Sequence, residues 1–501
     1  MGAVQKVGII LVKRTLRSLL QATVLLLACG AVTPPVDPFV RVLQLEQARS
    51  LGNGVLAEDL KSADRSLARR AALAIGRTKL PGGSALLAAQ LGDRDPGMRA
   101  MAVYGLGLIG DARQAPTIVR ALRYDRSSAV RAGALDALDR LESAKTLPAS
   151  TEHSAARAVA VTLQRDAAFL VRARAATTLE AFASSPDGFF AERTLLAAFE
   201  RSRSLDVRRN IMWSVFRGYA NRVPRRFLTA GLRDPDEVVR IEAARALGRV
   251  KNSDAIAALQ PALRDPSWRV REQAMESVLQ LQGKPLTEHL KSLPSGIVAP
   301  RVEPDRFADL PALPRTPASL KPAAPTAPRA FVPARFDPGT LAHMTGPMRG
   351  PHPRVRIVTT QGNLYLELYP EWAPLTVENF LDLANRGYYD NNRWFRIVPD
   401  FVVQTGDPTD TGDGDAGYTI PAEENPLEQD SYVISMGLNY DGNKPLRDSA
   451  GTQFYITLSP QLHLDRDFTV FGSMVSGFDV LGRLVESDRI VRVERIADTQ
   501  S

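Results

Sequence analysis

The sequence has 501 residues, more than a single hydrophobic core usually organises, so two or more domains are expected. Hydrophobic residues make up 44% and charged residues 24%, which are ordinary globular values and exclude a wholly disordered chain. The net charge of +8 would attract acidic partners, but the arginines are dispersed along the chain. Dispersed arginines favour a solvated surface, and no nucleic-acid partner is expected.

The first 29 residues differ from the rest of the chain. Four basic residues precede a short apolar run from Leu19 to Ala28, a pattern that predicts a secretory signal over residues 1–28. The order Leu26-Leu27-Ala28-Cys29 resembles the lipobox of bacterial lipoproteins. That resemblance implies cleavage before Cys29, the only cysteine, and a lipid on its thiol that anchors the exported protein to a bacterial membrane in the cell envelope. A buried cysteine in an ordinary signal helix, or a downstream translation start that leaves the protein cytoplasmic, are alternatives.

Between residues 60 and 290 a short pattern repeats. A Val-Arg or Met-Arg dipeptide begins an Ala- and Leu-rich run, at intervals of 31 to 41 residues, at Arg99, Arg131, Arg172, Arg208, Arg240 and Arg271. In the clearest copy the apolar residues from Val239 to Leu247 fall on one face of a helix. The period is close to that of helical hairpins, so the sequence predicts an all-α solenoid over residues 40–291.

Asp-Pro pairs precede three of these runs, at Asp95, Asp234 and Asp265. Aspartate followed by proline is typical of a helix start, so each pair is predicted to cap the second helix of a hairpin. Period and motifs together resemble HEAT repeats. The resemblance implies a concave surface for an unidentified protein partner, with a helical domain without any partner as the alternative.

Residues 292–352 interrupt the repeat and are rich in proline and alanine. Proline fixes φ and lacks a backbone donor, so this stretch is predicted to be an extended linker that separates two functional units. A ligand for a proline-binding domain is the alternative.

Residues 353–501 have the pattern of a β domain. Alternation from Val355 to Tyr369 around Gly362 predicts a hairpin, and residues 374–389 have mainly helical spacing. Short apolar runs follow at 393–398, 401–407, 432–437, 452–458 and 468–475, the first two joined by a Pro-Asp turn. The count predicts a closed antiparallel β-barrel with covering helices.

Six segments in this region carry a family resemblance: VENFLDLANRGYYDN, FRIVPDFVVQTGDPT, GYTIPAE, ISMG, GTQFYIT and HLDRDFTVFGSM. Over residues 355 to about 497 the chain resembles the cyclophilin-type peptidyl-prolyl cis-trans isomerases. The implied reaction rotates an X-Pro amide, whose barrier is roughly 18–20 kcal/mol, and breaks no covalent bond. The resemblance therefore explains why these segments pair no nucleophile with a base.

The resemblance also implies residue roles. Arg396 matches the catalytic arginine, which donates to the substrate carbonyl and favours a pyramidal prolyl nitrogen, and Gln404 matches the glutamine that orients substrate and arginine. The implied substrate pocket consists of Phe401, Val402, Gly437, Tyr455, Leu464 and Phe468. His463 stands where some eukaryotic members have tryptophan, and residues 437–452 form a longer segment than is typical, so the rim of the pocket is expected to differ.

The sequence thus predicts an isomerase that acts on proline-containing client polypeptides among envelope or exported proteins, with the HEAT array holding the client or another partner. A non-catalytic scaffold whose cyclophilin fold binds proline-containing peptides is the alternative. The five histidines lack metal-ligand spacing, and neither a metal nor a cofactor is expected.

Overall fold

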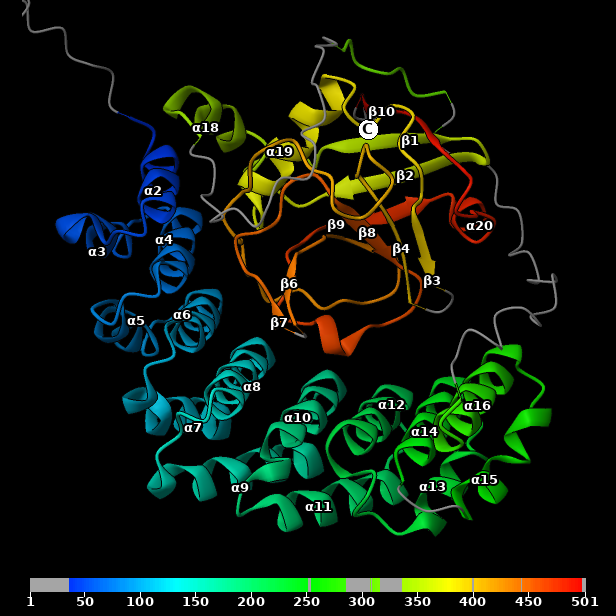
Figure 1. Cartoon of the computed structure of the whole chain (residues 1–501). Coiled ribbons are helices and arrows are strands. Elements are labelled where there is room, and N and C mark those ends of the chain that lie inside the picture. Colours follow the sequence, from blue (N-terminus) through cyan, green and yellow to red (C-terminus); the bar gives the residue numbers. More distant parts are fainter. Residues whose placement is uncertain are drawn as a thin grey trace, which may run out of the picture.

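The computed structural model describes residues 36–250, 254–284, 307, 309–315, 336–398, 401–442 and 444–497. It has two parts, a curved array of helices and a curled β sheet that lies on the concave side of the array (Figure 1). The predicted signal segment with Cys29 and the Pro-Asp turn at 399–400 lie outside the described residues. Within the described ranges, no helix has the length and apolar character needed to span a membrane.

The array is built from helix pairs, with one helix on the concave side and the next on the convex side (Figure 1). The concave helices are α2 (Pro38–Gln47), α4 (Arg65–Thr78), α6 (Pro96–Ile109), α8 (Ser128–Ser143), α10 (Phe169–Ala181), α12 (Leu205–Ser214), α14 (Glu237–Arg249) and α16 (Trp268–Leu281). The convex helices are α3 (Val55–Asp59), α5 (Gly83–Gln90), α7 (Ala115–Tyr124), α9 (Ala149–Arg165), α11 (Gly188–Arg201), α13 (Arg225–Gly231) and α15 (Asp254–Leu259). The predicted α-solenoid is confirmed.

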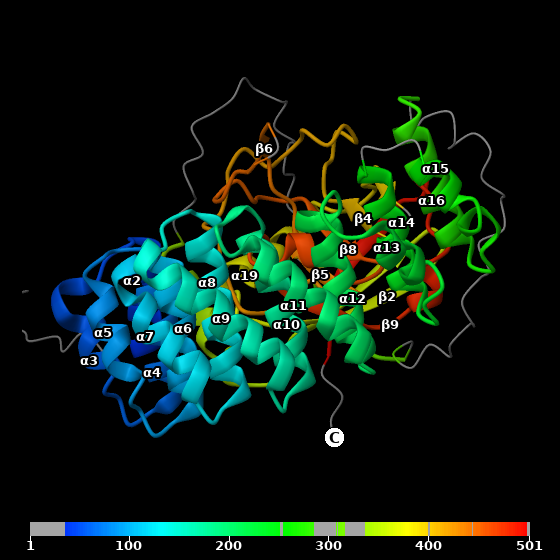
Figure 2. The ribbon, with the colours of Figure 1, turned by 90° about the horizontal axis from the view of Figure 1, so that it is seen from below.

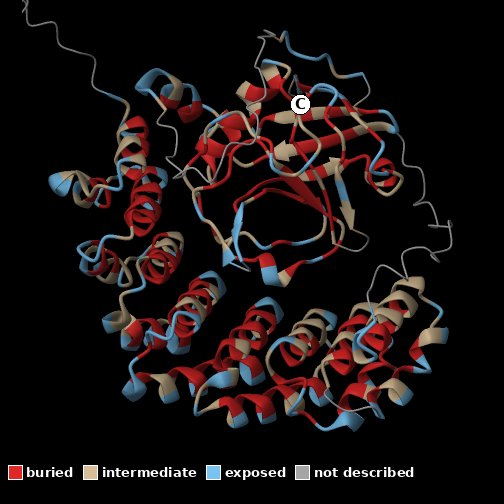
Figure 3. Ribbon diagram, in the orientation of Figure 1, coloured by how far each residue is buried: buried red, intermediate tan, exposed pale blue. Residues whose placement is uncertain are grey.

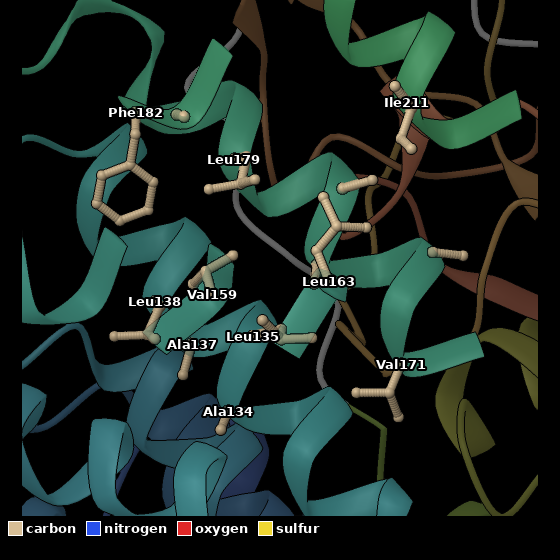
Figure 4. Close-up of a cluster of buried hydrophobic side chains, with 14 of the residues drawn as sticks. Ala134, Leu135, Ala137, Leu138, Val159, Leu163, Val171, Leu179, Phe182 and Ile211 are labelled. Carbon is tan, nitrogen blue, oxygen red and sulfur yellow. The ribbon is translucent and has the colours of Figure 1, made fainter. Parts of the chain in front are cut away.

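Small residues bring successive concave helices close together. Gly76 of α4 and Gly105 of α6 meet so closely that a Cβ on Gly76 would lie 2.6 Å from the Gly105 Cα. Further along, Ala134, Ala137 and Leu138 of α8 belong to the same continuous core (Figure 4). Burial follows the faces that the helices turn to one another (Figure 3), so each repeat is stabilised mainly by its neighbours.

The arginines of the Val-Arg pattern join neighbouring repeats. Arg131 donates to both carboxylate oxygens of Asp166 at 2.6 and 2.8 Å, and its Nη1 donates to the carbonyls of Asp125 and Arg126 at 2.9 and 3.1 Å. The same ion pair recurs between Arg99 and Asp125, Arg208 and Asp234, and Arg240 and Asp265. This series of ion pairs, called the ladder below, explains why an arginine and an aspartate recur together in these repeats. Arg172 instead donates to the carbonyls of Asp166 and Ala167.

The prediction for the Asp-Pro pairs is right at one helix and wrong at two. Asp95 caps α6 by accepting from the amides of Gly97 and Met98. The N-caps of α14 and α16 are instead Asp236 and Ser267. Asp234 and Asp265 lie two residues earlier, because each accepts from the amide of the cap residue and also pairs with the arginine of the preceding repeat.

Removing one rung of the ladder should destabilise the solenoid. In Arg131→Met the Asp166 side chain, which is only 6% exposed, loses its partner. The free energy of unfolding should therefore fall by about 2–3 kcal/mol. Denaturant unfolding followed by circular dichroism measures the change. Arg225→Met is the matched control, since Arg225 and its partner Asp254 are 46% and 64% exposed, and it should behave like wild type. Equal effects of the two variants would contradict the role of the ladder.

The C-terminal domain is an eight-stranded antiparallel sheet in the order β10-β1-β2-β9-β5-β8-β4-β3. The strands are β1 (Arg354–Thr359), β2 (Gly362–Leu368), β3 (Arg396–Val398), β4 (Val402–Thr405), β5 (Val433–Met436), β8 (Phe454–Thr457), β9 (Val470–Ser476) and β10 (Ile490–Ile496). The sheet curls until a bridge between Arg393 and Arg489 links its two ends. Helix α19 (Pro374–Asn385) supplies Phe380, which packs against the core rings of Phe454 and Phe471. The predicted antiparallel β domain is confirmed, with β10 as an additional strand.

The described part of the predicted linker is not a free spacer. Helix α18 (Pro338–Thr345) lies within it, begins with Pro338 at its first position and is capped by Asp337. Residues 311–313 run along β10, where the carbonyl of Pro311 accepts from Ala497 and the amide of Leu313 donates to Arg495. The prediction overlooked that proline suits a first helical turn and that its carbonyl can still pair at a sheet edge.

Arg77, at the end of α4, binds the C-terminal domain directly. Its Nη2 donates to the carbonyl of Trp372 at 2.7 Å and its Nε to the carbonyl of Glu424 at 2.9 Å, while Nη1 pairs with Glu46 at 2.8 Å. The Arg77 side chain is 2% exposed. Burial alone would raise the pKa of Glu46, but Arg70 and Arg77 together hold it below its usual value. One buried cluster therefore neutralises the charge of Glu46 and also satisfies two backbone carbonyls of the C-terminal domain.

A second buried cluster lies farther along the interface. Arg174 of α10 pairs with Asp136, Asp465 and Glu428, and Arg466 pairs with Asp139. Apolar contacts flank the two clusters, with Trp372 against Tyr104 of α6, and Leu375 and Leu341 against α2. The view from below shows the C-terminal domain lying along the array (Figure 2).

Arg77→Leu should loosen the docking of the two domains. The change leaves Glu46 short of a partner and removes two donors to backbone carbonyls, so a loss of about 3–5 kcal/mol is expected. Hydrogen exchange should speed up around residues 372–376 and 422–426. Arg49→Leu tests specificity, because Arg49 pairs across the same interface with Asp448 but is 52% exposed. Unchanged exchange in Arg77→Leu would refute the role assigned to Arg77.

Candidate active site

The strand pair β3–β4 brings Arg396 and Gln404 together. The two residues are register partners, and Nη1 of Arg396 donates to Oε1 of Gln404 at 3.1 Å. Nε2 of Gln404 donates onward to Oε1 of Gln453 at 3.1 Å, and Gln453 donates to the carbonyl of Gly412 at 2.7 Å. Arg396 remains exposed, so its other guanidinium donors can reach a bound ligand.

An apolar cluster lies beside this polar row. Val402, Tyr455, Leu464 and Phe468 are buried together, and Phe401 packs against them while remaining partly exposed. The guanidinium carbon of Arg396 lies 5.3 Å from the centre of the Phe401 ring. A cationic donor thus stands next to an apolar surface, which suits a ligand with a carbonyl beside a compact apolar ring.

Tyr455 is positioned by a hydrogen bond on the far side of the cluster. Its hydroxyl donates to Oε1 of Gln429 at 3.1 Å, and its ring meets Phe468 edge-on at 5.8 Å. Burial raises the pKa of Tyr455 well above its usual value. The phenol is therefore neutral and acts as a shaped apolar wall, not as a proton donor or acceptor in the physiological range.

Gly437 borders the glutamine pair. A Cβ at this position would lie 3.2 Å from the Gln453 Cβ and 3.4 Å from Nε2 of Gln404. The long segment after it forms the small hairpin β6 (Tyr440–Asp441) and β7 (Lys444–Pro445), and the Tyr440 ring lies 6.4 Å from that of Phe468. The hairpin therefore adds an aromatic side chain to the rim.

His463 forms another part of the rim. Its ring stacks on Phe401 with a centroid separation of 5.3 Å and an interplanar angle of 24°. Loss of hydration and the nearby Arg217 and Arg245 lower the pKa of His463 to about 4, although the residue is exposed. At neutral pH this side chain is uncharged and extends the aromatic surface.

The structure thus brings together all eight residues for which the sequence predicts catalytic or pocket roles. Sequence reasoning missed Gln453 and Tyr440. Gln453 lies inside the GTQFYIT segment, and its type and position next to a strand were available signals, whereas Tyr440 depends on how the long segment folds back. Among the described residues no group of three or more histidine, cysteine or acidic side chains is arranged to hold a metal ion.

Comparison with known proteins identifies the family of each part of the chain. Residues 354–499 match the family described as cyclophilin type peptidyl-prolyl cis-trans isomerase/CLD, and residues 55–139 and 225–297 match HEAT repeats. Peptidyl-prolyl cis-trans isomerase CYP18-2 of Arabidopsis thaliana is 38% identical over 151 residues, which is 30% of this chain and 92% of that protein. Peptidyl-prolyl cis-trans isomerase B of Bacillus subtilis is 43% identical over 132 residues, 26% of this chain and 88% of that protein.

Among solved structures, a cyclophilin type peptidyl-prolyl cis-trans isomerase from Cryptosporidium parvum is similar. It shares 29% identity, with a TM-score of 0.28, and the match covers 29% of this chain and 99% of that one. From the sequence relatives, the chain belongs, through its C-terminal domain, to the cyclophilin-type peptidyl-prolyl cis-trans isomerases. It carries that enzymatic domain behind an array of HEAT repeats.

Gln404→Ala should lower the catalytic rate. The variant removes the acceptor that orients the Arg396 guanidinium, so kcat should fall about tenfold while KM changes less. A peptide isomerisation assay measures both constants. Gln361→Ala serves as control, because Gln361 is an exposed glutamine that bonds Asp488 in the same domain. A loss confined to KM would show that Gln404 only binds substrate.

Proposed function

We propose that this isomerase acts on X-Pro bonds of envelope or exported proteins and that its HEAT array binds the client or a partner. The observation that carries the catalytic part is the row Arg396–Gln404–Gln453 beside the apolar cluster around Phe401. The cluster holds the pyrrolidine ring, and Arg396 donates to the carbonyl of the substrate. Donation that strengthens as the amide twists lowers the rotational barrier without any proton transfer to substrate.

The site for this reaction is prepared before substrate binds. Arg396 already bonds Gln404, and Gln404 already bonds Gln453, so the donors need little rearrangement. Apolar walls keep water from the amide, which strengthens the hydrogen bond to its carbonyl. Both features favour the twisted amide over the planar one.

The HEAT array supports the client-binding part of the proposal by its placement. The isomerase domain lies on the concave side, where solenoids present their extended binding surface. A polypeptide held on the remaining concave surface would stay close to the active site, which raises the effective concentration of its X-Pro bonds.

Arg396→Ala in the full-length chain tests the catalytic assignment. The variant removes the donor and should lower kcat/KM for an Ala-Pro tetrapeptide by about 10²–10³-fold, with an unchanged circular dichroism spectrum. Arg396→Lys keeps the charge but not the guanidinium fork and should recover only part of the rate. Arg386→Ala, an exposed arginine of the same domain paired with Asp382, should be fully active. Full activity of Arg396→Ala would favour a peptide-binding scaffold that does not use this donor.

The mature N-terminus tests the proposed location. The run from Leu19 to Ala28 followed by Cys29 supports cleavage before Cys29 and lipid on its thiol. Mass spectrometry of the protein expressed in a bacterium should find Cys29 as the first residue, carrying acyl chains, in the membrane fraction. Cys29→Ser should remain unlipidated. An unmodified N-terminus at Met1 in the cytosol would contradict the envelope assignment.

A further inference from the structure

A cavity of about 380 Å³ lies between the two domains. It adjoins the apolar cluster of Val402, Tyr455, Leu464 and Phe468 with Phe401, which we call the prolyl pocket. Val398, Phe401 and His463 form its wall on the isomerase side. The opposite wall comes from residues of α12, α14 and α16 and of the π-helical turn Val215–Tyr219 that follows α12. Figure 1 shows these three helices on the side of the array that faces the C-terminal domain. The volume of the cavity falls in the range of sites that bind small molecules or short peptide segments.

The cavity and the prolyl pocket share Phe401. Phe401 packs against the cluster that contains Val402 and Leu464, and its ring also stacks on His463 at the edge of the cavity. An extended chain advances about 3.3 Å per residue. A polypeptide whose proline occupies the pocket would therefore reach the cavity within a few residues on one side.

The solenoid wall is aromatic. Trp213, Phe216 and Trp268 line it and are each only partly buried, although large aromatic residues normally gain stability by full burial. Arginines lie over two of these rings, with the guanidinium carbon of Arg217 5.8 Å from Trp213 and that of Arg249 4.1 Å from Phe216. Because these contacts already hold the rings in place, the rings lose little conformational entropy when a ligand binds to them.

The charges around this wall have both signs. Arg217, Arg245 and Arg269 line the cavity together with Glu272 and Glu276, and Arg269 pairs with Glu237. Arg245 is already engaged by Glu242 and Gln273, and burial together with Glu276 raises the pKa of Glu272. Since charges of both signs surround the cavity, its net charge does not select the ligand. Recognition must come from the aromatic wall.

We propose that this cavity is a second substrate subsite, in which Trp213, Phe216 and Trp268 bind a bulky apolar side chain a few residues away from the isomerised proline. The inference rests on the isomerase function proposed above and adds a preference that the HEAT array supplies. The array thereby determines which X-Pro bonds are turned over efficiently, not only which client is held nearby.

The test compares peptides that differ only at a distance from the proline. A tetrapeptide with an Ala-Pro bond occupies the prolyl pocket alone. A series of ten-residue peptides carries the same bond and one phenylalanine moved from two to five positions on either side, with an all-alanine peptide as reference. Exchange between the cis and trans forms, followed by NMR with the full-length protein, gives kcat/KM for each.

At one set of positions on one side of the proline, the phenylalanine peptide should be turned over about tenfold more efficiently than the alanine peptide. The double variant Trp213→Ala/Trp268→Ala should lose this advantage and keep wild-type activity on the tetrapeptide. Trp268→Phe should retain most of it. Phe189→Ala, an aromatic residue of α11 that is 72% exposed and outside the cavity, should change nothing.

The outcomes separate the subsite from the catalytic function. Tetrapeptide activity without any phenylalanine preference would overturn the subsite and leave the isomerase intact. An increased rate on long peptides in the double variant would also overturn it, because the wall would then be an obstacle. Loss of tetrapeptide activity in the double variant would indicate misfolding, in which case the single variants Trp213→Ala and Trp268→Ala decide by the same comparison.

Discussion

A single arginine shows how the two domains depend on each other. The guanidinium of Arg77 donates hydrogen bonds to two backbone carbonyls of the C-terminal domain. Within its own domain, Arg77 neutralises Glu46. A guanidinium this deeply buried costs a large desolvation energy unless every donor is matched. Its hydrogen bonding is complete only when the isomerase domain is docked, because separation of the domains would remove two of its acceptors. The interface is therefore part of the fold, not an incidental contact.

The second cluster carries this constraint to the active site. Asp465, whose carboxylate faces Arg174 of the solenoid, directly follows His463, which stacks on Phe401, and Leu464, which belongs to the apolar cluster. The same carboxylate accepts from the amide of Gln429, the residue that holds the Tyr455 hydroxyl. One ion pair with the HEAT array thus contacts the segments that shape the prolyl pocket. Beyond it the interface opens into the cavity lined by Trp213 and Trp268.

Local patterns in the sequence predicted the secondary structure and the strand pairing of the site. The hairpin β1–β2 follows from two-residue alternation, and the pairing of Arg396 with Gln404 follows from two short strands joined tightly. The helix caps of α14 and α16 were misplaced because the aspartates also serve the neighbouring repeat. Docking could not be predicted, since the partners of Arg77 lie 295 and 347 residues away in the chain. For the same reason Trp213 and Trp268 read as ordinary helix residues until the isomerase domain is placed opposite them.

The central claim is that the isomerase domain has one fixed position on the concave side of the HEAT array. A distance distribution between spin labels in solution tests it most directly, with cysteines introduced at the exposed Arg226 on α13 and Lys444 on β7 in a Cys29→Ser background. The account predicts one narrow distribution in the wild-type interface, which broadens when Arg77→Leu is added. A broad distribution that Arg77→Leu leaves unchanged would show that the domains are tethered and not docked, and would contradict the account.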